Sequence, residues 1–143
     1  MRRVFLDANV VIDALLEEDE NMEAALRILG LAEQGVIETY CSSLSLATAS
    51  YFMEKAKIDH KQQVERINIY CQICNVTTVD AAVVRQALDS SFTDFEDALQ
   101  YFSAMTEDAD IIVTRNGSDF THAEIPVQTP AQFLDMMEKE IND

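Results

Sequence analysis

The sequence predicts an α/β protein of three layers, in which helices cover both faces of a mainly parallel central sheet of four to five strands. Two observations predict this fold class. Short apolar runs of strand length alternate with longer amphipathic segments of helical period along the chain. Apolar residues make up 48% of 143 residues, with only three glycines and two prolines, which fits a compact chain without long linkers. We therefore expect one domain, residues 1–143.

Five short apolar runs have the length and composition of buried strands. In chain order they are residues 4–6, 38–41, 76–79, 110–114 and 125–127. The last run contains Pro126, which fits an edge strand because proline cannot donate a hydrogen bond to a neighbouring strand. Helical segments separate all but the last two runs. The crossover connections are therefore expected to be right-handed and the strands parallel.

The helices are predicted from periodic apolar residues and from residues that begin or end a helix. In chain order the first follows Asp7, the next four span about 22–34, 44–57, 60–74 and 80–90, the sixth begins at Thr93 or Asp94, and the last spans about 130–141. Aspartate, serine or threonine can cap most of these starts, and Pro130 fits the first turn of the last helix. Gly35 closes the second helix, which follows an acidic break at residues 17–21.

The charge balance excludes a broad electrostatic attraction to nucleic acid. The chain has 26 acidic and 10 basic residues, a formal net charge of −16. A polyanion must therefore be drawn in by a metal ion or by a local basic patch. The one basic concentration lies around a predicted helix–helix turn and consists of Lys55, Lys57, Lys61 and Arg66. Most of the acidic residues serve solubility in the simplest interpretation.

Cysteine use and hydropathy indicate the compartment. Three cysteines are too few for a disulfide framework, and their odd number fits a reducing environment. Cys71 and Cys74 have C-x-x-C spacing, but no second pair completes a zinc site, so core packing is the favoured role. Charged residues within the first seven positions predict no signal peptide, and no apolar run is long enough to span a membrane. We expect a cytoplasmic protein.

Carboxylate and amide side chains stand at positions that a parallel sheet brings to one edge. Asp7 follows the first strand, Asn116 and Asp119 follow the fourth, and Asp94 and Asp97 share a face at a helix start. Open α/β sheets hold their sites at the carboxyl ends of the strands. Carboxylates gathered there repel one another, and a divalent ion offsets that cost. Oxygen ligands suit Mg²⁺ or Mn²⁺ rather than zinc.

The predicted ligands are Asp7, Asp97, one of Asp94 and Asp119, and Asn116. A water made more acidic by such an ion can attack a phosphodiester while the ion stabilises the departing oxygen, which is the chemistry of a metal-dependent nuclease. Simpler roles stay open, since Asp7 and Asp94 can act as helix caps and Asn116 can serve a turn.

Further residues have weaker predictions. Arg115 lies beside the predicted site and can bind a phosphate bidentately or pair with a neighbouring carboxylate. Ser43 and Thr48 lie where the second strand meets its helix, and they are candidates for capping or for a contact to the site. Asp13, Glu54 and Glu96 are interpreted as surface residues, and no role is assigned to His60 or His122.

Four segments together resemble the PIN domain family. They are residues 5–13 (FLDANVVID), 94–100 (DFEDALQ), 112–120 (IVTRNGSDF) and 125–130 (IPVQTP). Within that family the chain most resembles the small bacterial single-domain group allied to the VapC toxins of toxin–antitoxin pairs. The resemblance implies a three-layer α/β/α fold, Mg²⁺- or Mn²⁺-dependent endoribonuclease activity on RNA, a homodimer and a neutralising antitoxin protein.

The resemblance places the first acidic ligand on Asp7 and the third on Asp97, with Asp94 as the extra acid of the group. Thr48 stands where PIN nucleases usually have a glutamate, and Asn116 stands at the late aspartate, with Asp119 a turn further on. These two departures remove up to two charges, which lowers the expected metal affinity and argues against a second ion.

Two functional classes follow from these observations. The first is a metal-dependent endoribonuclease of PIN type, and the second is a catalytically weak or inactive PIN-like module that binds protein or RNA. A phosphatase-like or receiver-like domain ranks below both, because no lysine follows the later strands in the expected way and no aspartate stands in an obvious nucleophile pattern.

Overall fold

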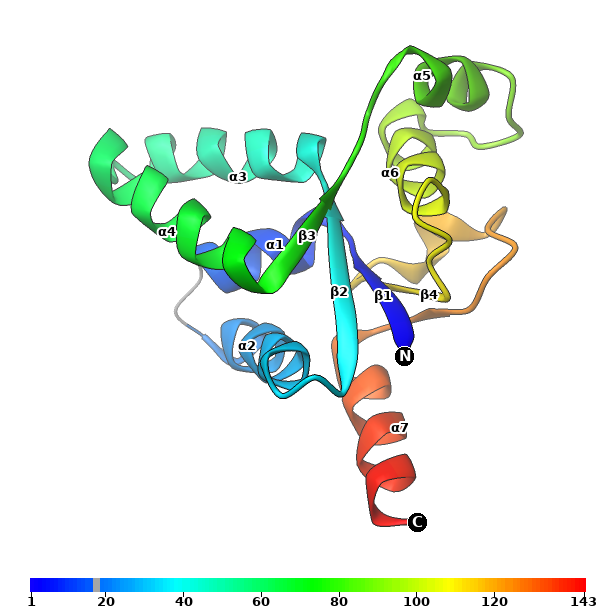
Figure 1. Cartoon of the computed structure of the whole chain (residues 1–143). Helices are drawn as coiled ribbons and strands as arrows, with labels where there is room; N and C mark the ends of the chain where they lie inside the picture. Colours follow the sequence, from blue (N-terminus) through cyan, green and yellow to red (C-terminus); the bar gives the residue numbers. More distant parts are fainter. Residues whose placement is uncertain (17–18) are drawn as a thin grey trace.

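The computed structural model describes residues 1–16 and 19–143 (Figure 1). The described residues form five strands, seven α-helices and one short 3₁₀ helix, in the order predicted from the sequence. The strands are β1 (Arg2–Leu6), β2 (Ile37–Ser42), β3 (Cys74–Thr77), β4 (Ile111–Val113) and β5 (Val127–Gln128). The helices are α1 (Ala8–Leu15), α2 (Glu20–Glu33), α3 (Ser43–Lys55), α4 (His60–Ile73), α5 (Ala81–Leu88), α6 (Phe95–Met105), η1 (Gly117–Phe120) and α7 (Pro130–Asn142).

The five strands form one parallel sheet in the order β3-β2-β1-β4-β5. The first strand of the chain is therefore the central one, with β2 on one side and β4 on the other. The predicted fold class, a three-layer α/β/α domain around a mainly parallel sheet, is confirmed. Since all neighbouring strands point the same way, their carboxyl ends lie at a single edge, with the end of β1 in the middle of it.

Alternating side chains of the strands build a separate core on each face of the sheet. Val4 and Leu6 are fully buried and pack in one cluster with residues of α1, α2, α3, α4 and α7. Phe5 points to the opposite face and packs with Tyr101 and Ala104 of α6. Figure 1 shows α1 to α4 on one side of the sheet and α5 and α6 on the other. Each large apolar side chain that is fully buried in these cores, such as Val4, Leu6 or Phe5, contributes about 1.5–3 kcal/mol.

The predicted helix starts are confirmed by their caps. The side chains of Asp59, Asp80, Asp94 and Thr129 each accept a hydrogen bond from a backbone amide in the first turn of their helix. Gly35 stands two residues after the end of α2 and has a positive φ of 75°, a conformation that glycine adopts without strain.

Several element boundaries differ from the prediction by one or two residues, and three of these shifts have a clear structural basis. Strand β3 begins two residues earlier, because Cys74 is already extended and pairs with Thr39. Strand β5 is shifted to Val127–Gln128, in register with β4. Helix α2 begins at Glu20 behind the cap Asp19, inside the predicted acidic break, of which residues 17–18 lie outside the described residues.

The cysteines divide between core and surface. Cys41 and Cys74 are buried, as core packing predicts, whereas Cys71 is exposed, so the core prediction was wrong for that residue. Among the described residues, no helix has both the length and the apolar content to cross a membrane.

Candidate functional site

The strand register brings Asp7, Ser42 and Thr114 side by side at the carboxyl edge of the sheet. Phe5 pairs with Tyr40, so Asp7 and Ser42, each two residues further on, lie level with each other. Leu6 pairs with Val113, so Asp7 also lies level with Thr114. The backbone amide of Asp7 continues the ladder and donates to the carbonyl of Val113 at 3.0 Å. Because side chains alternate along a strand, Asp7 lies on the same face as Phe5, the face that α6 covers.

Asp7 is only 5% exposed and is held from two sides. Its Oδ1 accepts from the amide of Ala8 at 2.9 Å, which is the predicted helix-cap role. Its Oδ2 accepts from Thr114 Oγ1 at 2.8 Å and from Asn9 Nδ2 at 3.3 Å. Burial raises the pKa of Asp7, and the bonds from Thr114 and Ala8 oppose that rise. The carboxylate is therefore rigidly placed at the centre of the edge.

A buried hydrogen-bond network holds α6 over the same edge. Gln100 is 1% exposed; its Oε1 accepts from Ser42 Oγ at 2.6 Å, and its Nε2 donates to Ser45 Oγ at 2.8 Å. Asp97 stands three residues earlier on the same helix face, so this network turns Asp97 toward the carboxyl ends of the strands. Ser42 also caps α3, as predicted for Ser42 or Ser43, but its contact with Gln100 was not predicted from the sequence, although the spacing of three between Asp97 and Gln100 is a usable signal.

Several carboxylates lie close enough to Asp97 to repel its negative charge. Partial burial, followed by repulsion from Asp94, Asp119, Asp7 and Glu96, raises the pKa of Asp97 to about 7. Asp94 caps α6, with its Oδ1 accepting from the amide of Asp97 at 3.0 Å. The structure thus brings the other three predicted acidic residues, Asp7, Asp94 and Asp119, within electrostatic reach of Asp97; their roles as ligands stay a prediction. Glu96 is exposed, as predicted, yet it adds to the same field.

The donor set fits a loosely held magnesium or manganese ion rather than a closed cage. Among the described residues, no three histidine, cysteine, aspartate or glutamate side chains are already placed as a ready-made ligand group. Both oxygens of Asp7 and one of Asp94 already accept hydrogen bonds from the protein. Mg²⁺ is typically held by one or two carboxylates and keeps several waters, which matches such a set. The mutual repulsion at Asp97 is the unfavourable term that an ion would relieve.

Arg115 forms an ion pair with the carboxylate of Asp13, which is one of the two roles predicted for it. Its Nε lies 2.8 Å from Asp13 Oδ2 and its Nη2 lies 3.2 Å from Asp13 Oδ1, a bidentate contact. Asp13 is 1% exposed, so its interpretation as a surface residue was wrong. Asn9, four residues before Asp13 on the same face of α1, accepts from the amide of Arg115 at 3.1 Å through its Oδ1. This spacing of four was the available signal for Asp13.

The remaining predicted residues lie at the edge with little direct engagement. Asn116 and Asp119 are exposed in the loop after β4, where the amide of Asp119 donates to the carbonyl of Asn116 at 3.0 Å. Ser43 is exposed at the first turn of α3, but the capping hydroxyl belongs to Ser42. The hydroxyl of Thr48 donates to the carbonyl of Leu44 within its own helix at 3.0 Å. Substrate contacts by Ser43 and Thr48 stay a prediction.

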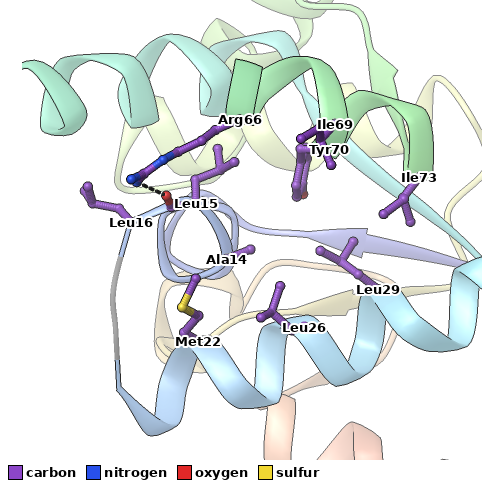
Figure 2. Close-up of a pocket in the computed structure, with 10 residues that line it drawn as sticks. All are labelled: Ala14, Leu15, Leu16, Met22, Leu26, Leu29, Arg66, Ile69, Tyr70 and Ile73. Atoms are coloured by element: carbon purple, nitrogen blue, oxygen red, sulfur yellow. Dashed lines mark hydrogen bonds between the residues drawn. The ribbon is translucent and has the colours of Figure 1, made fainter. Parts of the chain in front are cut away.

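An apolar groove of about 370 Å³, the α1–α2–α4 groove, lies outside the acidic site. Figure 2 shows Leu26 and Leu29 of α2 facing Tyr70 and Ile73 of α4, with the end of α1 between them. Leu26 is 46% exposed and Ile69, on the α4 side, is 61% exposed. Exposed apolar side chains that gather around a groove mark an interaction surface more often than scattered ones do.

The fold and the site together define a three-layer α/β/α domain with carboxylates gathered at the carboxyl edge of its parallel sheet. A family model described as PIN domain matches residues 3–118, and the chain belongs to the PIN domain family. The family predicted from the sequence is thereby confirmed.

The chain is also similar to individual proteins. Over 138 residues the chain is 28% identical to "Ribonuclease VapC1" of Aquifex aeolicus (strain VF5), with 93% of this chain and 94% of the relative aligned. A solved structure of VapBC2 from Rickettsia felis, bound to a DNA fragment from their promoter, has a TM-score of 0.66 at 18% identity and covers 89% of this chain and 98% of its own. FitAcB from Neisseria gonorrhoeae has a TM-score of 0.63 at 18% identity, over 90% and 98%. At these identities the two structures establish the fold alone.

Proposed function

We propose that this chain is an endoribonuclease of the VapC toxin type that hydrolyses RNA phosphodiesters with Mg²⁺ or Mn²⁺. The observation that carries the proposal is Asp97, whose pKa of about 7 reflects burial and four neighbouring carboxylates at the edge where this family is expected to bind metal. The ribonuclease name of a relative that is 28% identical over nearly the whole chain supports the same activity.

Each residue at the edge has a proposed role in this reaction. Asp7, fixed by Thr114 and Ala8, and Asp97, turned inward by Gln100, would hold the ion. Asp94 and Asp119 position water or complete the ligand set, and Asn116 offers a neutral oxygen. An ion held there would supply a more acidic water and would stabilise the oxygen that leaves phosphorus.

Arg115 contributes a positive charge to a strongly acidic protein. Asp13 holds the guanidinium through Nε and Nη2, and the Arg115 side chain is still 43% exposed. A phosphate of the RNA can therefore meet a cation whose geometry is fixed before binding.

Addition of Mn²⁺ to the metal-free chain tests this proposal. Calorimetry is expected to give binding of one ion, with release of protons at pH 7 because the ion displaces the proton that Asp97 holds. A fluorophore-labelled single-stranded RNA is expected to be cleaved with Mn²⁺ and to stay intact with excess EDTA. Mn²⁺ binding without cleavage of any RNA supports the alternative, an inactive PIN-like binding module whose Thr48 and Asn116 replace two acids. Absence of Mn²⁺ binding contradicts the nuclease proposal.

We also propose an antitoxin protein as partner, docked on the α1–α2–α4 groove. Solved neighbours of the fold are complexes such as VapBC2 and FitAcB, and the groove offers this chain an apolar seat for a helix. A net charge of −16 favours basic residues on the flanks of that helix.

We also propose a homodimer that uses a different surface. Tyr51 and Phe52 of α3 are exposed aromatic side chains that a second copy of the chain could cover. Sedimentation would detect this dimer.

Replacing Ile69 with aspartate is expected to weaken this complex at least about tenfold, because a charge would be buried against an apolar helix. The measurement is the affinity for the product of the neighbouring gene, by co-purification and titration. Val64→Asp is a matched control, since Val64 is also exposed on α4 but lies outside the groove. Equal losses in both variants, or none in Ile69→Asp, would place the partner elsewhere.

A further inference from the structure

Another pocket, here named the aromatic pocket, is lined by residues that stand close in sequence to Asp94 and Asp119, and it has no role in the chemistry described above. It has a volume of about 300 Å³ and is lined by Ser90, Phe92, Tyr101, Phe102, His122 and Glu124. Its walls are the loop before α6, the outer side of α6 and the segment after η1. The volume is at the lower end of small-molecule sites, which suits one flat ring system.

Aromatic rings form most of the wall, and Phe92 is at their centre. The Phe92 ring lies 5.1 Å from Tyr101, 6.0 Å from Phe102 and 5.7 Å from His122 between ring centroids. Phe92 is only partly buried and His122 is exposed, so the two rings can offer surface to a ligand. Tyr101 is fixed from behind, because its hydroxyl accepts from the amide of Glu124 at 3.2 Å. The wall is therefore preorganised.

Each of the two loops that build the pocket also leads to a carboxylate of the acidic edge. Phe92 stands two residues before Asp94, the cap of α6, and His122 stands three residues after Asp119. Because only two or three residues separate the pocket from the carboxylates along each loop, a flat group held there would be within one nucleotide's reach of a phosphate at the carboxylate cluster. That is the relation between a nucleobase and the phosphodiester of the same RNA strand.

The polar wall selects among flat ligands. Glu124 accepts hydrogen bonds and does not donate when it is ionised. A phosphate would be repelled by Glu124 and by the net charge of −16, whereas a neutral base would not. Guanine presents two adjacent N–H groups on its Watson–Crick edge, which a carboxylate can accept together. Proteins read single-stranded RNA in this way, by stacking unpaired bases on aromatic rings and bonding their edges.

We propose that the aromatic pocket binds an unpaired base of the RNA, guanine in preference, beside the phosphate at the acidic edge. This inference rests on the proposed function only in taking RNA as the ligand. Base stacking on aromatic side chains changes affinity by about fivefold to more than a hundredfold per base, so single substitutions are measurable.

The test uses a fluorescein-labelled UUGUU pentanucleotide with an uncharged methylphosphonate backbone, which isolates base binding from metal and phosphate contacts. Fluorescence anisotropy is expected to show tighter binding of UUGUU than of UUUUU by the whole chain. Phe92→Leu and His122→Ala are each expected to weaken UUGUU binding at least about fivefold. Glu124→Gln is expected to remove the preference for guanine. Phe95→Leu, which changes an exposed ring of α6 outside the pocket, is expected to leave binding unchanged.

The outcomes separate this inference from the proposed function. Equal binding of the two oligonucleotides, or unchanged binding in both Phe92→Leu and His122→Ala, overturns the base pocket even if the chain cleaves RNA with Mn²⁺. Guanine-dependent binding that is lost in these variants supports the pocket even if Mn²⁺ produces no cleavage. His122→Ala removes an exposed side chain, so a folding defect in Phe92→Leu does not weaken the test.

Discussion

Replacing Asp7 or Asp97 with asparagine is expected to lower the rate of Mn²⁺-dependent RNA cleavage at least about 100-fold. Each change removes one charge from the proposed ion site and keeps the shape of the side chain. Asp7→Asn also disturbs the contact with Thr114, whose hydroxyl donates to Asp7 Oδ2. The measurement is the initial rate at saturating and limiting Mn²⁺, together with Mn²⁺ affinity by calorimetry.

Asp135→Asn is the control for loss of one negative charge. Asp135 pairs with Lys139 on the surface of α7, and both side chains are largely exposed. This variant is expected to keep the cleavage rate and the Mn²⁺ affinity within about twofold, because exposed ion pairs contribute little. If Asp97→Asn retained wild-type cleavage and Mn²⁺ affinity, Asp97 would not be a ligand.

Asp97→Asn has a second expected effect, on the stability of the metal-free chain. A carboxyl whose pKa is raised to about 7 in the folded state, from 3.8, stabilises the fold only while it is protonated. Its contribution is therefore complete below about pH 3.8 and is lost as the pH rises toward 7. In EDTA at pH 8, Asp97→Asn should unfold at a higher urea concentration than wild type, and the difference should vanish near pH 3.5. Solvent screening of this half-exposed group keeps the gain to about 1 kcal/mol or less.

Mn²⁺ is expected to reverse that order at pH 8. The ion stabilises the wild-type chain by mass action, whereas the variant lacks one of its ligands. Asp97→Asn would then lose activity and yet be more stable than wild type without metal. This combination is expected of a carboxylate that destabilises the metal-free fold and is needed for metal binding. A variant that is less stable than wild type at pH 8 in EDTA would instead make Asp97 a structural residue.

The fold was predictable because local signals and tertiary packing agree in this chain. Caps such as Asp59 and Thr129 stand directly before periodic apolar segments, and strands such as β1 are buried on both faces. Strand boundaries were less accurate, since β3 and β5 depend on pairing with β2 and β4 and not on their own residues. The edge where the site lies followed from parallel strand direction alone.

The partners of the site residues were not predictable in the same way. Gln100 lies between apolar residues of α6, and nothing local shows that its amide meets Ser42 and Ser45 across the sheet edge. In the sequence, nothing distinguishes Asp13 from the many other acidic residues of the chain. Its contact with Arg115 forms only because the loop after β4 folds next to α1. Such contacts join residues far apart in sequence, so only the folded register reveals them.

Replacing Arg115 with alanine is expected to destabilise the chain by about 2 kcal/mol. The bidentate contact to Asp13 is lost, and that carboxylate stays buried without the guanidinium. Removing one partner of a buried ion pair costs about 3–5 kcal/mol, and water reaching the half-exposed arginine position lowers the figure here. Arg115→Lys should recover only part of the loss, because an ammonium cannot match both oxygens of Asp13. Urea unfolding at pH 7 in EDTA measures both variants.

Arg3→Ala is the matched control for this change. Arg3 pairs with Glu38 at 3.8 Å, and both side chains are more than 40% exposed, so its loss is expected to change stability by less than about 1 kcal/mol. Arg115→Ala should also weaken RNA binding, because it removes a cation at the rim of an acidic site. A stability equal to that of Arg3→Ala, with RNA affinity reduced, would mean that Arg115 serves substrate binding alone. The reverse result would mean that its contact with Asp13 is its whole contribution.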